Sequence, residues 1–283
     1  MFVSSQISDT QRVIREAKLA GKTIGFVPTM GALHQGHMSL VQAARNKCDF
    51  VVASVYVNPT QFNNADDLHA YPKTLKEDLE KLKTHQCDLV FTPSDEVMYP
   101  EKAYISIDFG KLGSLMEGEY RPGHFSGVGQ IVTKLFNIIQ PDQAFFGQKD
   151  FQQLSLIKRL VKEFCFPITI QKVATAREAH GLAMSSRNER LNPTLRQEAK
   201  IFYDALCLVK NLIEEEPMLD FKQIKEKVSE KFKDSNADLE YLEIVSDHNL
   251  IPKRENYLET DTVICIAGFI GNVRLIDNIY LIS

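Results

Sequence analysis

The sequence predicts a doubly wound parallel α/β domain followed by a smaller α+β domain. Up to about residue 176, apolar runs typical of strands alternate with segments whose apolar residues recur at helical spacing. The run 50–57 is almost continuously apolar and β-branched, which is the pattern of a parallel strand covered on both faces. After residue 177, helices are followed by strands without alternation. We therefore expect one domain over residues 1–176 and a second over residues 177–283.

Local signals place the elements of the first domain. Ser8-Asp9-Thr10-Gln11 has the form of a capping box, and Gly21 ends the helix that it opens. Strands are predicted at 23–27, 50–57, 89–91, 144–146 and 168–175. Helices are predicted directly after residue 37, from Leu75 onward, over 128–138 and over 150–164, with a loop over 58–73.

The second domain is predicted from its own signals. Pro193 suits the first turn of a helix, which we expect to run through Leu212. A charged amphipathic helix follows at 221–232. Strands are then predicted at 239–245, 262–269 and 273–281, and they complete an α+β unit.

Composition limits the classes of function. The 283 residues carry a formal net charge of −4, which argues against a general binder of nucleic acid or anionic membranes. The five cysteines include no CxxC pair, which fits reduced thiols and gives no zinc site. The longest apolar stretch, 263–270, is too short to span a bilayer, and the first residues lack the features of a secretion signal. We expect a cytoplasmic protein that binds neither nucleic acid nor membrane.

The most informative segment is PTMGALHQGH at 28–37. It follows an apolar run and precedes a helical pattern, so His34 and His37 lie where a helix exposes unpaired N–H groups. Such a terminus attracts phosphate through its donors and its dipole, and imidazoles add further donors. The position favours nucleotidyl transfer. The alternative is that the two histidines only cap the helix.

Two further segments favour the same chemistry. In the turn 145–150, Gly147 permits close backbone approach and Lys149 supplies a cation beside a helix N-terminus. Beyond the last strand of the first domain, Ser185, Ser186 and Arg187 lie on a loop suited to binding polyphosphate and to closing over a site as a lid. Each segment alone has a simpler reading as a surface turn or loop. Together with the histidine turn they predict one anion-binding cleft at the carboxyl ends of the strands.

Five blocks of the sequence resemble one known family. They are 28–37, VNPTQF at 57–62, RPGHF at 121–125, FFGQKDFQQ at 145–153 and GLAMSSRN at 181–188. In combination they resemble the pantothenate synthetases, or pantoate–β-alanine ligases, within the HxGH nucleotidyltransferase superfamily. The resemblance implies a Rossmann-like first domain and a C-terminal lid domain.

The resemblance also implies a reaction in pantothenate biosynthesis. The carboxylate of (R)-pantoate attacks the α-phosphorus of ATP, which gives pantoyl adenylate and pyrophosphate. The amine of β-alanine then attacks the adenylate and releases AMP and pantothenate. The family uses Mg²⁺ with the phosphates. The resemblance also implies a homodimer that forms through the first domain, and strand 50–57 with the neighbouring loop is a plausible region for the contact.

The resemblance carries roles to individual residues. The catalytic group is His37, the family's acid, with His34, Lys149 and Arg187. The ATP contacts are Met30, Gly31, Ala32, Leu33, His34, Gln35, Gly36, His37, Gly147, Gln148, Lys149, Asp150, Ala176, Met184, Ser185, Ser186 and Arg187. The substrate contacts are Gln61, Gln153, Asn58 and Arg121, with Gln61 and Gln153 the pair that hydrogen-bonds pantoate. Asp78, with Glu77 beside it, matches the segment near Mg²⁺.

One position departs from the family pattern, and other readings remain. His180 stands where the family usually has an acidic residue, and a histidine there would bring positive charge toward the phosphates. The alternatives are an adenylyltransferase acting on phosphopantetheine or a mononucleotide, a class I aminoacyl-tRNA synthetase, and a nucleotide-binding regulatory module without catalysis. The segments 57–62 and 121–125 are foreign to the first, and the acidic balance argues against the second.

Overall fold

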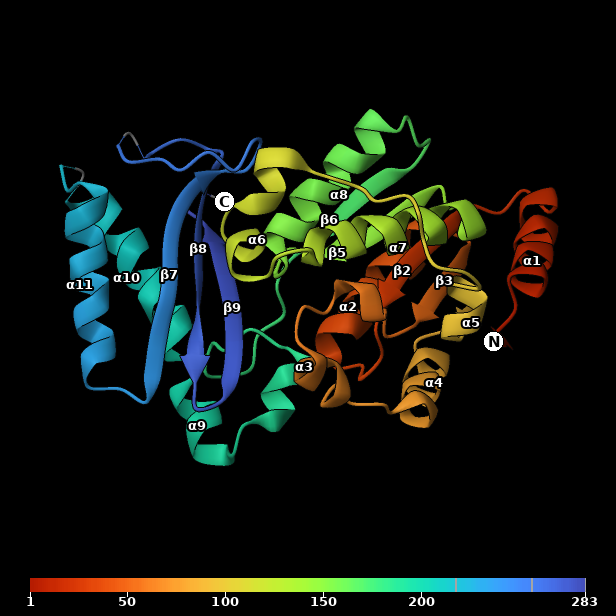
Figure 1. Cartoon of the computed structure of the whole chain (residues 1–283), viewed down its shortest axis with the longest axis horizontal. Helices are drawn as coiled ribbons and strands as arrows, with labels where there is room; N and C mark the ends of the chain where they lie inside the picture. Colours follow the sequence, from red (N-terminus) through yellow and green to blue (C-terminus); the bar gives the residue numbers. More distant parts are fainter. Residues whose placement is uncertain (217, 256, 283) are drawn as a thin grey trace. The chain divides into compact units, whose positions relative to one another are not determined.

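The computed structural model describes residues 1–216, 218–255 and 257–282. Contacts between residues group the chain into two compact units. Unit 1 comprises Met1–Gly147 and Leu156–Ala174, and unit 2 comprises Gln148–Ser155 and Thr175–Ser283 (Figure 1). Each unit has its own sheet.

Unit 1 contains a six-stranded sheet in the order β1-β4-β3-β2-β5-β6, and all of its pairs are parallel. Strand β2 lies at the point where the strand order reverses, between β3 and β5. Ligands of such sheets bind beyond the carboxyl ends of the strands at this point. The predicted doubly wound fold is confirmed. The strands are β1 Phe2–Ser4, β2 Ile24–Thr29, β3 Phe50–Val55, β4 Leu89–Phe91, β5 Gln143–Gly147 and β6 Thr169–Val173.

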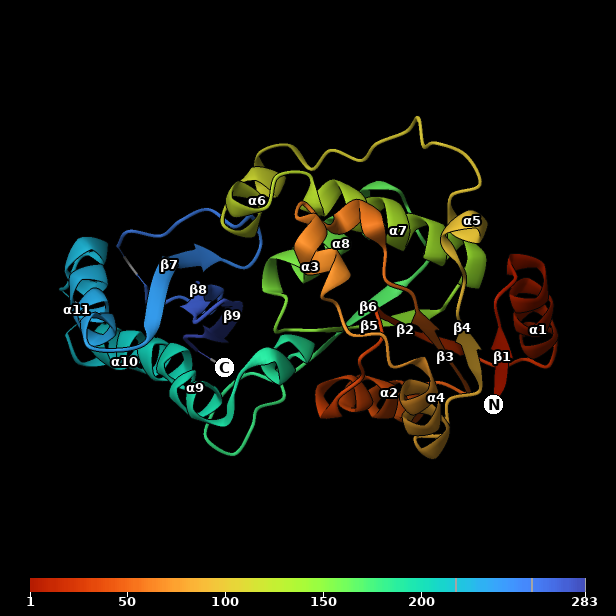
Figure 2. The same ribbon diagram turned by 60° about the horizontal axis from the view of Figure 1, so that its bottom comes forward.

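Helices cover both faces of this sheet. In Figure 2, α2 and α4 lie on one face and α7 on the other. Val27, Val41, Leu82 and Val90 belong to one buried cluster on the first face, which joins β2 and β4 to α2 and α4. The helices are α1 Ile7–Leu19, α2 Gln35–Lys47, η1 Pro59–Gln61, α3 Ala65–His69, α4 Leu75–Thr84, α5 Asp95–Met98, η2 Gly110–Ser114, α6 Glu117–Tyr120, α7 His124–Ile139 and α8 Phe151–Glu163.

Three details of unit 1 differ from the sequence predictions. The capping box at Ser8 is wrong: α1 begins at Ile7, and its N-cap Gln6 makes no side-chain cap bond. Ser4 accepts from the backbone N–H of Gln6, so the chain turns into the helix earlier than expected. The predicted loop 58–73 contains η1 and α3. The short strand β1 was not predicted, because three residues carry too little periodicity to distinguish a strand.

The subunit contact was predicted for strand 50–57 and the neighbouring loop, and the strand part of that region, β3, is enclosed within the unit. It is paired on both edges, by β2 and β4, and Val51, Val52, Ala53 and Ser54 are buried within the unit. Neither the backbone nor these side chains can therefore meet a second chain.

Within the described ranges, no helix is both long enough and apolar enough to cross a bilayer.

Unit 2 contains an antiparallel sheet in the order β7-β8-β9, packed against helices, as predicted. The one helix predicted from Pro193 to Leu212 is two, because a tight turn at Ala199 directs both Ala199 and Phe202 into the buried cluster. The elements are η3 Ser186–Arg190, α9 Pro193–Glu198, α10 Ile201–Glu215, α11 Phe221–Lys233, β7 Ala237–Ser246, β8 Thr262–Ile270 and β9 Val273–Tyr280.

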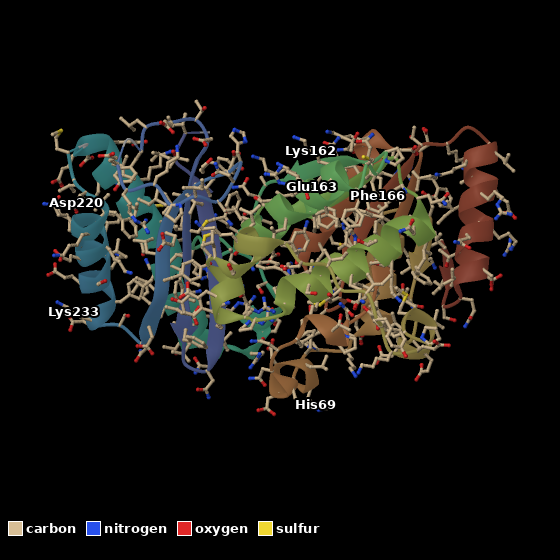
Figure 3. All side chains as sticks on the ribbon, turned by 45° about the horizontal axis from the view of Figure 1, so that its top comes forward. His69, Lys162, Glu163, Phe166, Asp220 and Lys233 are labelled. Carbon is tan, nitrogen blue, oxygen red and sulfur yellow. The ribbon has the colours of Figure 1, made fainter. Side chains whose placement is uncertain are left out.

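The predicted helix 221–232 forms with caps at both ends. Asp220 accepts from the backbone N–H of Gln223, whose side chain accepts in return from the N–H of Asp220. Figure 3 shows Asp220 at the beginning of α11 and Lys233 at its end. A carboxylate at the first turn and a lysine at the last both favour the helix dipole.

Candidate active site

The turn between β2 and α2 is anchored by a buried carboxylate. Gly31 and Ala32 both have positive φ, +85° and 49°. Asp78 of α4 accepts the backbone N–H of Ala32 at 2.9 Å and of Leu33 at 2.7 Å, and its side chain is fully buried. A Cβ on Gly31 would lie 3.1 Å from Asp78 Oδ2, so glycine is needed here for space as well as for φ.

Helix α4 holds this turn through a second polar contact and through its packing. Lys81 Nζ donates to the carbonyl of Leu33 at 2.5 Å. Leu33 and Leu82 both belong to the buried cluster under the sheet. The polar and apolar contacts of α4 therefore fix Ala32 and Leu33, just before α2 begins.

His34 and His37 cap helix α2 and are fixed in one tautomer by doing so. His34 is the N-cap residue, and its Nδ1 accepts from the N–H of Gly36 at 3.1 Å. His37 Nδ1 accepts from the N–H of His34 at 3.2 Å. A ring nitrogen that accepts from an amide carries no proton, so each neutral ring bears its hydrogen on Nε2. The predicted capping role is real, and it also sets two Nε2–H donors at a helix N-terminus, with ring centroids 4.1 Å apart.

A network of amides and hydroxyls fixes Gln61. Tyr99 Oη donates to Asn58 Oδ1 at 2.9 Å, and Asn58 Nδ2 donates to Gln61 Oε1 at 3.3 Å. The oxygen end of the Gln61 amide is thereby engaged, and its Nε2 lies 2.7 Å from Met30 Sδ at the end of β2. Burial raises the pKa of Tyr99, so its hydroxyl keeps the proton that it donates. Tyr99 was not singled out in the sequence, and no local motif marks it.

Arg121 is linked to Gln61 through His124. Its guanidinium donates to His124 Nε2 at 3.1 Å and lies 3.8 Å from Glu117. His124 Nδ1 in turn donates to the carbonyl of Gln61 at 2.7 Å. Arg121 therefore supports the backbone of Gln61 through His124, a residue that the sequence reading quoted only as part of a motif.

Of the remaining predicted residues, Gln35 begins α2 and Gly147 ends β5, and the others belong to unit 2. Lys149 is largely buried, with Nζ 3.8 Å from Asp150 Oδ1, and Gln153 follows on α8. Ala176 accepts from the N–H of Met184 at 2.9 Å.

The serine loop of unit 2 is shaped by its own side chains. Ser185 is the N-cap of η3 and accepts from the N–H of Arg187 at 3.3 Å. Ser186 is buried, and Arg187 is half-buried. Ser185, Ser186 and Arg187, which were predicted to lie on a loop, therefore lie at the start of one short helical turn.

The geometry of Asp78 does not fit the predicted magnesium site. Both of its oxygens accept backbone N–H groups, and Thr74 Oγ1 lies 3.3 Å from Oδ2. A divalent ion requires carboxylate oxygens that are accessible to it and to its water ligands. Asp78 is completely buried, so its role is to hold the turn, while the neighbouring Glu77 is exposed.

His180 is held by polar contacts within unit 2. Its Nε2 donates to the carbonyl of Arg196 at 3.0 Å, and its Nδ1 lies 4.0 Å from Glu178. Glu178 also pairs with Arg196 at 3.0 Å and accepts from Asn188 at 2.9 Å. The imidazole is therefore part of a polar cluster that ties α9 to η3.

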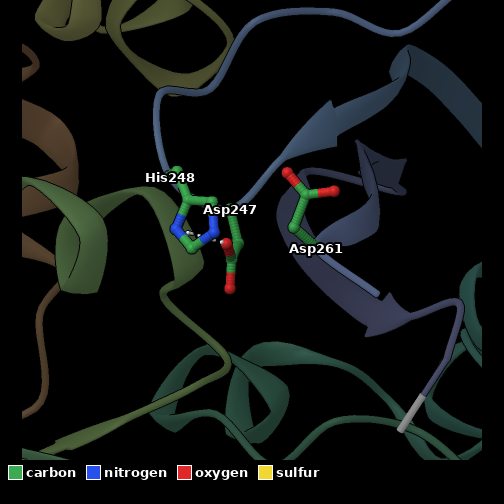
Figure 4. A group of neighbouring side chains, drawn as sticks. All are labelled: Asp247, His248 and Asp261. Atoms are coloured by element: carbon green, nitrogen blue, oxygen red, sulfur yellow. Dashed lines mark ion pairs between the residues drawn. The ribbon is translucent and has the colours of Figure 1, made fainter. Parts of the chain in front are cut away.

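A further group of titratable side chains lies at the edge of the small sheet. Asp247, His248 and Asp261 are near one another, and Figure 4 shows the pairing of His248 with Asp247. Lys253 contacts Asp261 at 2.7 Å and also pairs with Glu259. The ammonium group of Lys253 already balances the carboxylate of Asp261. The cluster is therefore an ion-pair network that closes the loop between β7 and β8.

Comparison with known proteins gives full-length matches. The profile of the family described as Pantoate-beta-alanine ligase matches residues 3–280. The pantothenate synthetase of Thermoanaerobacter sp. (strain X514) is 44% identical over 285 residues, which cover 99% of this chain and 98% of that protein. That of Aliivibrio fischeri is 44% identical over 281 residues, with 99% and 96% covered.

Solved structures agree with these matches. The crystal structure of pantothenate synthetase from Thermus thermophilus has a TM-score of 0.92 at 37% identity, with both chains fully covered. The pantoate-beta-alanine ligase of Francisella tularensis, solved as a complex with "Beta-gamma ATP" and β-alanine, has a TM-score of 0.82 at 34% identity over 99% of this chain and 98% of that one.

The anchoring role of Asp78 predicts a specific loss in Asp78→Asn. The amide has one oxygen, so one of the two turn N–H groups is left buried without an acceptor, at a cost of about 1–3 kcal/mol of unfolding free energy. Urea unfolding and the hydrogen exchange of the Ala32 and Leu33 amides measure the loss. The matched control is Glu77→Gln on the exposed neighbour, which should change stability by no more than about 0.5 kcal/mol. Equal stability and unchanged exchange in Asp78→Asn would contradict the anchoring role.

Proposed function

Because the chain belongs to the pantoate–β-alanine ligase family, it is an ATP-dependent ligase that joins pantoate to β-alanine to form pantothenate, and we propose that it does so through pantoyl adenylate. The carboxylate of pantoate attacks the α-phosphorus of ATP, and the bond to the pyrophosphate oxygen breaks. The β-alanine amine then attacks the acyl carbon, loses a proton, and expels AMP. The observation that carries this proposal is the pair of Nε2–H donors that His34 and His37 present at the N-terminus of α2.

Charge is the main obstacle to the first step. A carboxylate must approach a polyanionic nucleotide, so donors have to compensate the charge that builds up around phosphorus. The dipole of α2 and the imidazoles of His34 and His37 supply this compensation without a covalent intermediate. Histidines that also cap a helix keep one tautomer, so their donors need no reorganisation during the reaction.

Lys149 and Arg187 provide cations for the same step. We assign Lys149 and Arg187 to the charge that develops on the phosphoryl oxygens and on the leaving pyrophosphate. Their segments, 147–150 and 184–187, together with 30–37 and Ala176, form the proposed ATP contacts. The loop 183–187 is proposed to close over the adenylate and to exclude water.

Pantoate is assigned to Gln61 and Gln153, with Asn58 and Arg121 supporting. The fixed orientation of the Gln61 amide supports this, because the Tyr99–Asn58 contacts engage its oxygen and leave the N–H₂, which lies beside Met30 Sδ, as its donor end. A neutral donor binds the attacking carboxylate without a tight ion pair that would reduce its nucleophilicity. Arg121 is partnered by Glu117 and His124 and contributes through the position of Gln61.

The remaining assignments rest on family membership. Mg²⁺ is proposed to travel with ATP, held by phosphate oxygens and water rather than by Asp78. A homodimer is proposed with contacts outside β3. A cytoplasmic location is proposed, since the five cysteines are free, as in a reducing compartment.

Exchange between pyrophosphate and ATP tests the adenylation step in the unmodified protein. We expect labelled pyrophosphate to enter ATP only when pantoate is present, without any need for β-alanine. Exchange that is independent of pantoate would indicate another acyl substrate. Tight ATP binding without exchange would indicate a regulatory protein instead.

Measuring the two half-reactions separately tests the role proposed for Lys149 in adenylate formation. In Lys149→Ala we expect adenylate formation to slow by about 10²–10³-fold, the scale of one lost donor to a developing oxyanion. Conversion of synthetic pantoyl adenylate and β-alanine should slow much less, since no charge builds up at phosphorus in that step. Rapid-quench kinetics from each starting point measure both rates. Lys158→Ala, on the exposed side of α8, is the control and should alter neither rate. Equal losses in both steps would withdraw the transition-state role.

A further inference from the structure

Two phosphate-binding segments of unit 2 are attached to the same dipeptide of β9. The turn at Gln148-Lys149 and the loop that begins at Arg177 are separated in sequence. The turn is hydrogen-bonded to Asn278, and Arg177 is hydrogen-bonded to Asp277 and to the carbonyl of Asn278. Both residues of the dipeptide are buried. The adenylation mechanism proposed above gives these two residues no part.

Asn278 fixes the backbone on either side of the Lys149 side chain. Its Nδ2 donates to the carbonyl of Gln148 at 3.0 Å and to that of Lys149 at 2.8 Å. Its Oδ1 accepts from Gln148 Nε2 at 3.4 Å. Both ends of one buried amide are thus used on this turn, which sets the peptide planes from which Lys149 projects.

Asp277 fixes Arg177 with a bidentate pair. Its two oxygens accept from Nη1 at 2.6 Å and from Nη2 at 3.0 Å. The N–H of Asn278 donates to Asp277 Oδ1 at 2.7 Å, so the carboxylate is tied to its own strand as well. The Arg177 guanidinium lies 4.1 Å from the centre of the Tyr203 ring, which restricts it to one plane.

Arg177 carries this constraint into the serine loop. Its Nη1 donates to the carbonyl of Gly181 at 3.0 Å, and its backbone forms an antiparallel bridge with Ala183. The N–H of Met184 then bonds to the carbonyl of Ala176. The residues that follow are Ser185, Ser186 and Arg187, so their starting point depends on where Asp277 holds Arg177.

We propose that Asp277 and Asn278 are positioning residues that set the distance between Lys149 and the loop 185–187 for adenylate formation. This inference rests on the proposed function. A dipeptide that served only to satisfy buried polar groups would have no reason to join these two segments in particular. A displacement of about 1 Å in a group that contacts the reacting atoms lowers rates about 10²-fold, so a rigid spacer between the two segments has a direct effect on the reaction.

The test compares Asn278→Ala and Asn278→Asp with the unmodified enzyme in both half-reactions. We expect adenylate formation to slow at least about tenfold in Asn278→Ala, mainly in kcat, with the KM for pantoate within about twofold and the step from synthetic adenylate affected much less. Asn278→Asp should be slower still, because an ionised carboxylate faces two carbonyl oxygens. Its rate relative to the unmodified enzyme should recover as pH falls, since the protonated acid regains one donor.

Leu275→Val on the same strand is the matched control. Leu275 is buried in the apolar cluster of unit 2, so this variant lowers the melting temperature without touching either segment. It should leave the ratio of the two half-reactions unchanged. Equal slowing of both half-reactions in Asn278→Ala, or a loss no larger than in Leu275→Val at matched stability, would overturn the positioning role. Absence of pantoate-dependent exchange in the unmodified enzyme would instead overturn the proposed function.

Discussion

The turn between β2 and α2 keeps its conformation because a carboxylate from another helix accepts two of its backbone N–H groups. Glycine accepts the positive φ at Gly31, but the positive φ of Ala32 directly after it is unfavourable for a residue with a side chain. Asp78 offsets this strain, and the packing of Leu82 keeps Asp78 in place. The tautomers of His34 and His37 follow, since they depend on where α2 begins.

Neutral and charged donors are divided between the two units. The imidazoles of His34 and His37 and the amide of Gln61 are neutral, and the cation nearest to them in the hydrogen-bond network, Arg121, is engaged by Glu117 and His124. Lys149 and Arg187 belong to unit 2. In the proposed mechanism, neutral donors would leave the nucleophile reactive, and cations would neutralise the charge on its leaving group.

Local patterns predicted most of the fold and the segments that carry the candidate site. Strand β4 lies at the apolar run of three residues that predicted it. The parallel sheet was predicted from the alternation of strands with helices along the chain. Partnerships between distant residues were not predictable. Asp78 looked like a metal ligand because its position in the sequence does not reveal two backbone N–H groups more than forty residues away. The roles of Tyr99 and of the Arg177–Asp277 pair were not predicted for the same reason, since only the folded chain brings these residues and their partners together.

The transfer of oxygen from pantoate to AMP tests the adenylate route most directly. Pantoate labelled with ¹⁸O in its carboxylate is converted with ATP and β-alanine, and the phosphate products are analysed by mass spectrometry. If the carboxylate attacks the α-phosphorus and the amine then attacks the acyl carbon, the bridging oxygen leaves with the nucleotide, and each AMP carries one labelled oxygen. Unlabelled AMP, with the label recovered in pyrophosphate or orthophosphate, would contradict the adenylate mechanism.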